Sequence, residues 1–189
     1  MLAETTTVLC SSGLDAPQKK LLTRVAADLG ARVLPDFTIE CTHLVSDTVL
    51  TEKYRMAIKR RMPVVSLLWL EASRDAGTFV PEEDYLLKAL HNLVITLSGA
   101  SFDSRSRQLI KELVNCAGGT YQAVLCSKTT HLVADCAHGS KYESVLNNKR
   151  FLHVRTVSPA WLAASLAQHT CVDSKEYPLM PAAPIADQM

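Results

Sequence analysis

The feature that most constrains this chain is an internal repeat. The sequence Thr-His-Leu-Val occurs at residues 42–45 and again at 130–133, and a Lys-Tyr pair follows at 53–54 and again at 141–142. Both pairs of segments are separated by the same 88 residues (130 − 42 and 141 − 53). A register kept across tens of residues indicates that one fold occurs twice in this chain.

Further landmarks recur in the same order. A Ser-Gly pair closes an apolar run at residues 12–13 and again at 98–99, and glycine follows at Gly30 and Gly118. A Trp-Leu pair stands at 69–70 and again at 161–162. The two copies therefore differ by short insertions and share one architecture.

The composition limits the classes of protein that fit this chain. Of the 189 residues 48% are hydrophobic, which is enough to bury a core in each half. The net charge of +1 creates no global field that would attract nucleic acid or an anionic membrane. No apolar run is long enough for a membrane span, and the N-terminus lacks the pattern of a signal peptide. We expect a soluble intracellular protein without a membrane partner.

Hydrophobic periodicity predicts alternating short strands and amphipathic helices in each half. The predicted strands are 7–10, 32–34, 43–45 and 63–65, then 93–97, 120–125, 131–134 and 152–157. The predicted helices are 15–29, 51–60 and 67–76, then 103–116, 140–148 and 159–168. The order β-α-β-β-α-β-α predicts an α/β fold in which helices cover both faces of a small parallel sheet.

Polar groups gather where such a sheet binds ligands. The Ser12 hydroxyl and the Gly13 N–H follow the first strand, and Lys53 lies in the first turn of a later helix. Ligands of parallel α/β sheets bind beyond the carboxyl ends of the strands, and three converging donors suit a phosphate. The alternative is structural: Ser12 and Gly13 form a turn, and Lys53 is a solvated helix residue.

The ordered landmarks, Ser-Gly, Gly, Thr-His-Leu-Val, Lys-Tyr and Trp-Leu, resemble the breast-cancer C-terminal (BRCT) repeat, and two copies resemble a tandem BRCT module. The resemblance implies a four-stranded parallel sheet flanked by three helices in each repeat, with the repeats packed through a helical seam. In this chain Tyr54, Met56 and Ile58 would pack against helices 103–116 and 159–168. The implied boundaries are 5–86 for the first repeat, 87–91 for a short linker, 92–180 for the second repeat and 181–189 for a disordered tail.

The resemblance also implies the site residues. The first phosphate site would consist of Ser12, Gly13, Thr51 and Lys53, with Thr51 orienting Lys53. The second would consist of Ser98, Gly99, Ser140 and Lys141. Leu50 departs from the family pattern, because tandem modules that read an aromatic residue three places after the phosphate carry Arg at that position. Arg55 stands where an apolar residue often lines the side-chain pocket.

The resulting hypothesis is a phosphoserine- or phosphothreonine-peptide-binding module, monomeric and part of a larger nuclear scaffold in DNA-damage signalling or at the kinetochore. Two alternatives remain: a DNA-binding module whose pocket takes a DNA phosphate, and a phosphate-independent protein-interaction module. We expect no enzymatic activity, because no nucleophile stands beside a base in any recognisable motif. We expect no cofactor and no metal, since the Cys and His residues between 126 and 138 match no common zinc spacing.

Overall fold

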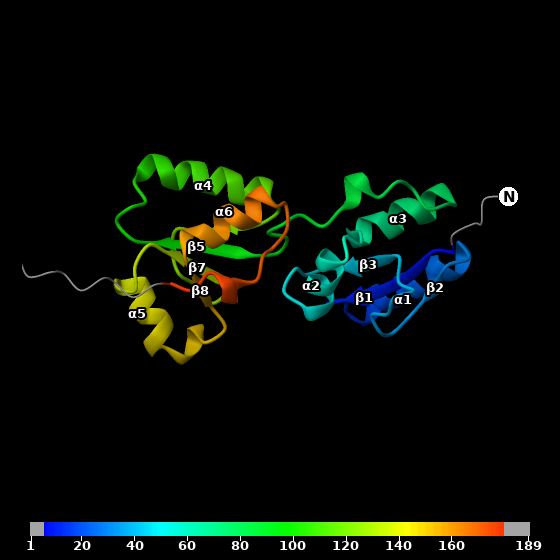
Figure 1. The fold of residues 1–189 in the computed structure, drawn as a ribbon, viewed down its shortest axis with the longest axis horizontal. Helices are drawn as coiled ribbons and strands as arrows, with labels where there is room; N and C mark the ends of the chain where they lie inside the picture. The colour runs from blue at the N-terminus through cyan, green and yellow to red at the C-terminus, as the bar shows by residue number, and fades with distance from the viewer. Residues whose placement is uncertain (1–5, 180–189) are drawn as a thin grey trace, which may run out of the picture. The chain divides into compact units, whose positions relative to one another are not determined.

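The computed structural model describes residues 6–179, so the predicted tail at 181–189 lies outside the described residues. The chain divides into two compact units between His91 and Asn92. Figure 1 shows one sheet with its own helices in each unit. The predicted α/β class and the duplication are therefore confirmed, with six α-helices and two parallel sheets in the described part of the chain.

The first unit contains one parallel sheet of four strands. Its elements are β1 (Val8–Ser12), α1 (Ala16–Asp28), β2 (Arg32–Val33), β3 (His43–Ser46), α2 (Glu52–Lys59), β4 (Val64–Val65) and α3 (Leu67–Ala76). The strand order is β2-β1-β3-β4, and every pairing is parallel. Because β1 and β3 are the inner strands, the carboxyl end of β1 lies near the middle of the edge formed by the strand ends.

The second unit repeats this plan. Its elements are β5 (Val94–Ser98), α4 (Ser104–Cys116), β6 (Thr120–Tyr121), β7 (His131–Ala134), α5 (Ser140–Asn147), β8 (Arg155–Val157) and α6 (Pro159–Ala167). The order β6-β5-β7-β8 matches the first sheet. In Figure 1, α4 and α6 lie on one side of this sheet and α5 lies on the other.

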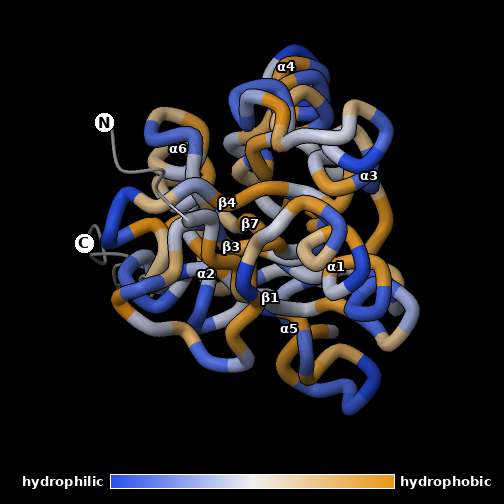
Figure 2. The backbone as a smooth tube through the Cα atoms, turned by 90° about the vertical axis from the view of Figure 1, so that its right-hand side faces the viewer, coloured by the Kyte–Doolittle hydropathy of each residue, from blue (hydrophilic) through white to orange (hydrophobic). Residues whose placement is uncertain are grey.

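Each unit buries a tryptophan against its sheet. Trp69 on α3 is 1% exposed and stacks on His43, and Trp161 on α6 is fully buried and stacks on His131. Each indole N–H donates to a backbone carbonyl, that of Val80 or of Val172. Figure 2 shows hydrophobic stretches along the sheet strands and hydrophilic stretches on the helices.

Aspartate side chains cap the N-termini of α1 and α4, the helices that follow β1 and β5. The Asp15 carboxylate accepts a hydrogen bond from the Gln18 N–H at 2.8 Å, and Asp103 accepts one from the Ser106 N–H at 2.7 Å. Such caps satisfy backbone donors that have no partner within the helix. The caps therefore place the first turns of α1 and α4 close to the ends of β1 and β5.

The strands predicted at 32–34 and 63–65 are each one residue shorter in the structure, and two others are shorter by several residues. The strand predicted at 120–125 ends at Tyr121, because the Gln122 N–H makes the last bond to β5 and the chain turns back between Cys126 and Thr129. The strand predicted at 152–157 begins only at Arg155, since residues 149–154 form turn hydrogen bonds around a short 3₁₀ helix, Lys149–Phe151. The predicted seam and domain boundaries stay predictions. Across residues 6–179, no helix combines the length and the apolar character needed to cross a membrane.

Candidate phosphate-binding site

The first pocket lies at the end of β1 and has a volume of about 690 Å³. Ser11, Ser12, Gly13, Thr51 and Lys53 all line it, so the structure brings the four predicted residues of this site together. They come from β1, from the turn after β1 and from the start of α2, which are far apart in the sequence.

Lys53 is held in place by the backbone. Its Nζ donates to the carbonyl of Ser11 at 3.2 Å and to the carbonyl of Pro35 at 2.6 Å. These two bonds tie α2 to the end of β1 and to the segment after β2. An ammonium group has three donors, so one N–H of Lys53 remains for a ligand.

Ser12 is bonded to the cap of α2. Its Oγ donates to the Thr51 Oγ1 at 2.7 Å, and the same Thr51 oxygen accepts the Tyr54 N–H at 3.2 Å. Thr51 therefore orients Ser12 and caps α2, while Lys53 is oriented by the two carbonyls. This assigns Thr51 a different contact from the one that the sequence suggested.

Gly13 occupies a position that other residues would not tolerate. Its φ is +70°, and a Cβ built there would lie 2.4 Å from the Thr48 Cγ2. Glycine adopts positive φ without steric cost. The turn therefore favours glycine, and Gly13 lines the pocket.

The second pocket lies at the end of β5 and has a volume of about 590 Å³. Lys141 Nζ donates to the carbonyls of Leu97 at 2.8 Å and Ala123 at 2.6 Å, which repeats the arrangement around Lys53. Burial, and secondarily the positive charge of Arg107, lower the pKa of Lys141 from its usual value. A bound anion would oppose both effects, because it would balance the charge of Lys141 in the partly buried site.

The hydroxyl groups of the second pocket are arranged differently. Ser98 is 7% exposed, and its Oγ makes no hydrogen bond to another residue of the described chain. Gly139 takes the place of Thr51 as the N-cap of α5 (139 − 51 = 88), and a Cβ built on it would lie 3.9 Å from the Ser98 Oγ. Ser140 also lines this pocket. The Ser98 hydroxyl is thus open to a ligand.

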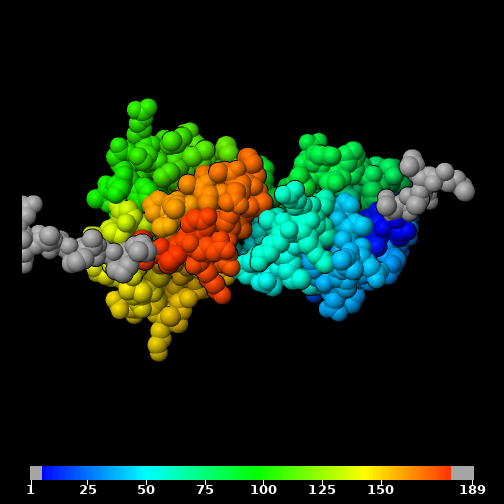
Figure 3. All heavy atoms as spheres, viewed as in Figure 1, coloured from blue at the N-terminus to red at the C-terminus, as the bar shows by residue number. Residues whose placement is uncertain are grey.

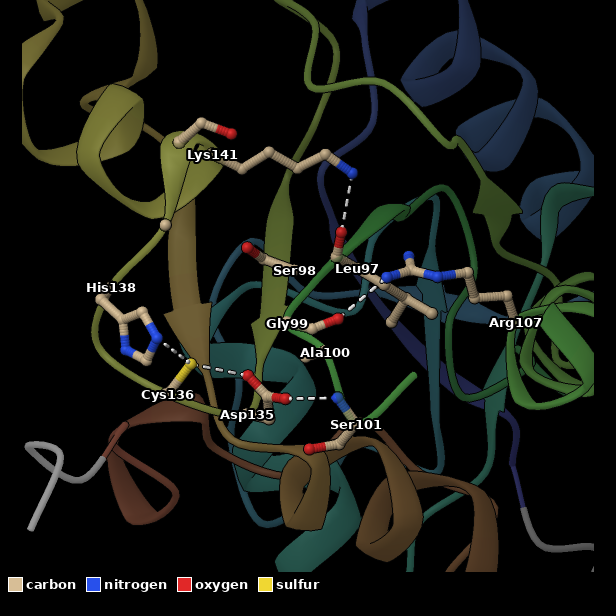
Figure 4. Close-up of a pocket in the computed structure, with 12 residues that line it drawn as sticks. Leu97, Ser98, Gly99, Ala100, Ser101, Arg107, Asp135, Cys136, His138 and Lys141 are labelled. Carbon is tan, nitrogen blue, oxygen red and sulfur yellow. Dashed lines mark hydrogen bonds between the residues drawn. The ribbon is translucent and has the colours of Figure 1, made fainter. Parts of the chain in front are cut away.

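Each pocket has a second basic residue that sequence reasoning missed. Lys19 on α1 lines the first pocket, and Arg107 on α4 lines the second. Arg107 donates to the carbonyls of Gly99 at 3.0 Å and Phe102 at 2.8 Å. Figure 4 shows Arg107, Ser98 and Lys141 around the end of β5, each from a different element. The sequence contains a signal for these two residues. Each lies four positions after the aspartate that caps its helix, and the two are 88 residues apart (107 − 19), so they are a repeated basic position.

An acidic residue beside the second pocket is already engaged. Asp135 accepts the Ser101 N–H at 2.9 Å and a bond from the Cys136 thiol at 2.8 Å, and these hydrogen bonds, that from Cys136 foremost, lower the pKa of Asp135 to about 2. Figure 4 shows Cys136 between Asp135 and His138. Within residues 6–179, no group of three or more His, Cys, Asp or Glu side chains is arranged to hold a metal ion.

Two residues that depart from the family pattern, Leu50 and Arg55, lie at the start of α2. Leu50 lies just before the Thr51 cap, and Arg55 forms an ion pair with Glu52 at 3.0 Å. Glu52 also lines the first pocket, and Arg55 offsets its negative charge. The ion pair therefore reduces the repulsion between Glu52 and an anion at Lys53, and no arginine stands at the position of Leu50.

The order of elements agrees with a family comparison. The model of the twin BRCT domain matches residues 7–69 and 93–161, which is more than half of the chain. The chain belongs to the twin BRCT family. Twin BRCT domains are interaction modules, and the fold expected from the repeated landmarks is confirmed.

Two sets of proteins resemble this twin BRCT chain. It is 30% identical over 187 residues to the S-M checkpoint control protein rad4 of Schizosaccharomyces pombe, covering 93% of this chain and 28% of that protein. It is 32% identical over 104 residues to the human mediator of DNA damage checkpoint protein 1, covering 43% of this chain and 5% of that protein. The chain thus spans only a small part of these relatives.

Solved structures of the Rad4 BRCT1,2 pair have the same fold. The pair in complex with a Crb2 phosphopeptide has a TM-score of 0.78 and 27% identity, covering 92% of this chain and 97% of that one. The pair in complex with an Mdb1 phosphopeptide has a TM-score of 0.80 and 26% identity, with the same coverage.

Proposed function

We propose that this chain is a phosphoserine- or phosphothreonine-peptide-binding module with one phosphate site in each repeat. The observation that carries the proposal is the repeated pocket: a lysine fixed by two carbonyls, a Ser-Gly turn and a basic residue of the preceding helix meet at the end of an inner strand. Charged donors and a hydroxyl in this arrangement match the oxygens of a phosphate monoester.

The comparisons support a peptide as the carrier of that phosphate. The Rad4 pair of the same fold holds phosphopeptides of Crb2 and of Mdb1. Because relatives of this chain are checkpoint proteins, we place the module in a larger nuclear scaffold of DNA-damage signalling and assign it no catalytic role. The net charge of +1 favours a peptide over a DNA backbone, which requires an extended basic surface.

Lysine substitutions test both sites. Lys53→Met and Lys141→Met each remove the one charge-assisted hydrogen bond that the lysine would donate to the phosphate, worth roughly 1.5–3 kcal/mol. Each should therefore weaken a singly phosphorylated ligand of its own pocket about 10- to 150-fold. Isothermal titration calorimetry measures the affinities. Lys59→Met is the matched control, because Lys59 is an exposed residue at the end of α2.

Peptides phosphorylated once and twice separate the two sites. If both pockets are used, a peptide with two suitably spaced phosphates binds more tightly than either singly phosphorylated form, since its second contact is intramolecular. Either lysine substitution should remove that gain. Equal affinities for phosphorylated and unphosphorylated peptides would contradict the proposal. A steep loss of affinity for DNA with rising salt would favour the nucleic-acid alternative.

A further inference from the structure

Two buried cysteines of the first repeat are in contact with each other. Cys10 lies on β1 and Cys41 lies two residues before β3, and both are free thiols. The Cys10 side chain makes a hydrogen bond with the Cys41 side chain, and the Cys10 Sγ lies 3.8 Å from the carbonyl oxygen of His43. The two thiols are therefore neighbours in the folded chain.

The second repeat has a matched pair of hydroxyl groups. Thr96 corresponds to Cys10 at the offset of the Ser-Gly pairs (96 − 10 = 86), and Thr129 corresponds to Cys41 at the offset of the Thr-His-Leu-Val segments (129 − 41 = 88). The Oγ1 atoms of Thr96 and Thr129 lie 3.4 Å apart, and both residues are fully buried. The contact thus belongs to the fold, but only the first repeat has side chains there that can form a covalent bond.

The Cys41 sulfur holds a turn beside the first phosphate pocket. It accepts the Thr38 N–H at 3.4 Å and donates to the Asp36 carbonyl at 3.7 Å. This turn directly follows Pro35, whose carbonyl accepts a bond from the Lys53 Nζ at 2.6 Å. A change at the Cys41 sulfur therefore acts on one of the two carbonyls that hold Lys53.

The other carbonyl lies next to Cys10. Ser11 follows Cys10 on β1, and its carbonyl accepts the second bond from Lys53 at 3.2 Å. Burial, followed by the charge of Cys41 and the hydrogen bond with it, raises the pKa of Cys10 to about 12, and the positive charge of Lys53 opposes this rise. A bond between the two sulfurs would join the two segments whose carbonyls fix Lys53.

Cys41 is the thiol that a small oxidant reaches first. Cys41 is 8% exposed, whereas Cys10 is fully buried. Cys41 ends a segment in which Pro35, Asp36, Ile39 and Glu40 are exposed. In Figure 3 the light-blue part of the first unit, which contains this segment, lies at the surface. Local opening of a surface segment requires less free energy than unfolding of the sheet, so it gives access to Cys41.

We propose that hydrogen peroxide converts Cys10 and Cys41 into a reversible disulfide, and that this disulfide weakens phosphate binding at Lys53. The Cys41 thiolate attacks one peroxide oxygen, the O–O bond breaks, one water leaves and a sulfenic acid remains. The Cys10 thiolate then attacks the sulfenic sulfur, the S–O bond breaks and a second water leaves. The two thiols lose two electrons and two protons, and the peroxide takes up both.

The inference rests on the proposed function, because it regulates the first of the two phosphate sites. In a disulfide, Cys41 has no S–H left to donate to the Asp36 carbonyl, and its sulfur moves closer to Cys10 than a hydrogen bond requires. The turn after Pro35 therefore shifts, and Lys53 loses part of its positioning. The second repeat has threonines at both places, so the site at Lys141 should not respond.

Mass spectrometry tests whether the disulfide forms. The protein is treated with hydrogen peroxide, its remaining thiols are blocked with iodoacetamide, and it is digested with trypsin. The tryptic peptides 1–19 and 33–53 each contain a single cysteine, Cys10 or Cys41. We expect these two peptides to be linked, with a mass two hydrogen atoms below their sum, and to separate when dithiothreitol is added.

Fluorescence anisotropy tests the effect on each pocket. The probe for the first pocket is a labelled peptide with one phosphoserine, selected for binding to the reduced Lys141→Met protein. Peroxide should weaken its binding about tenfold, because a displaced lysine loses most of one charge-assisted hydrogen bond. Dithiothreitol should restore the affinity. A corresponding probe of the Lys53→Met protein, which reads the second pocket, should bind equally well before and after oxidation.

The second repeat supplies the matched control variant. The double substitution Cys10→Thr and Cys41→Thr copies the pair at Thr96 and Thr129, so it should keep the affinity of the reduced protein and lose the response to peroxide. The single substitution Cys41→Ser, which keeps a hydroxyl group at this place, should behave in the same way. Cys116→Ser removes an exposed cysteine of the second unit and should keep the response.

The outcomes separate this inference from the function beneath it. The inference is overturned if the two tryptic peptides stay unlinked, if the linked protein binds as tightly as the reduced one, or if the response persists without Cys10 and Cys41. If the reduced protein binds phosphorylated and unphosphorylated peptides equally, the proposed function fails, and the regulatory inference fails with it even where the disulfide forms.

Discussion

The two pockets share a lysine but differ in the groups around it. In the first, the Ser12 hydroxyl is bonded to Thr51, and the second cation, Lys19, is an exposed side chain. In the second, Gly139 leaves the Ser98 hydroxyl open, and Arg107 is fixed by two carbonyls. The second pocket presents its donors already in position, whereas the first must break a hydrogen bond and order a lysine.

The comparison shows what duplication preserves. Lys53 and Lys141 each donate to two carbonyls. One belongs to the inner strand, at Ser11 or Leu97, and the other follows the edge strand, at Pro35 or Ala123. These bonds connect each helix to its sheet and also position the lysine, and both copies have them. The cap residue and the second cation differ between the copies. Thr51 accepts bonds from Ser12 and Tyr54 where Gly139 has no side chain, and Arg107 donates to two carbonyls where Lys19 is exposed.

The largest expected effect tests whether the two units have equivalent cores. Trp69→Ala and Trp161→Ala each remove a buried indole and leave a cavity, which typically costs about 3–5 kcal/mol. Chemical denaturation followed by circular dichroism should show a large loss of stability in both variants. A variant with normal stability that had lost only ligand binding would show that its tryptophan belongs to the site instead of the core.

A second effect should differ between the units, because their histidines differ in burial. Burial, followed by the charge of Arg155, lowers the pKa of His131 to about 3, and burial lowers that of the half-buried His43. His131 Nε2 is also a buried atom without a hydrogen-bond partner. Below its ordinary pKa of 6.5, the unfolded chain takes up a proton at His131 that the folded chain excludes. The free energy of unfolding therefore falls as the pH drops from about 6.5 toward 3.

Substitution isolates the contribution of each histidine. Between pH 6.5 and 4.5, His131 should lower the free energy of unfolding by roughly 2–3 kcal/mol. His131→Gln should flatten the fall in unfolding free energy between pH 6.5 and 4.5, and His43→Gln should flatten it less. Urea unfolding at several pH values measures both slopes. If the two variants keep the slope of the parent, His131 does not stay neutral in the folded chain.

The smallest predicted effect concerns the second cation of each pocket. Arg107→Met should weaken a ligand of the second pocket about tenfold, because the arginine is held in place before the ligand arrives. Lys19→Met should weaken a ligand of the first pocket only about two- to threefold, since an exposed lysine loses conformational freedom when it binds. Calorimetry with singly phosphorylated peptides compares them. Equal losses would mean that the two pockets are equally preorganised.

Sequence patterns predicted the elements well where the local signals agree. Helix Leu67–Ala76 and strand His131–Ala134 have the bounds that periodicity indicated, since apolar spacing and a terminal glycine or turn coincide there. The strands predicted at 120–125 and 152–157 were too long, because apolar residues such as Leu125 face the core from a turn as well as from a strand. Burial of an apolar residue therefore does not show whether its backbone is a strand or a turn.

The candidate site was predictable only in part. The recurring motif predicted that Ser12, Gly13 and Lys53 form one site. The structure places them around one pocket, and their binding of phosphate stays a prediction. Lys19 and Arg107 were missed because lysine and arginine in the first turns of amphipathic helices are common on solvated faces. The bond from Ser12 to Thr51 was also missed, since it joins residues 39 positions apart and depends on the geometry of the fold.

The carbonyl bonds of Lys53 and Lys141 have a consequence for the entropy of binding. A free lysine side chain loses up to about 2 kcal/mol of rotamer freedom when it is immobilised. In this fold that loss occurs when α2 and α5 dock on their sheets, long before any ligand is present. Each ammonium group then has one N–H left, aimed by the backbone. A ligand therefore meets a cation that needs no further ordering, and folding itself prepares the lysine for its anion.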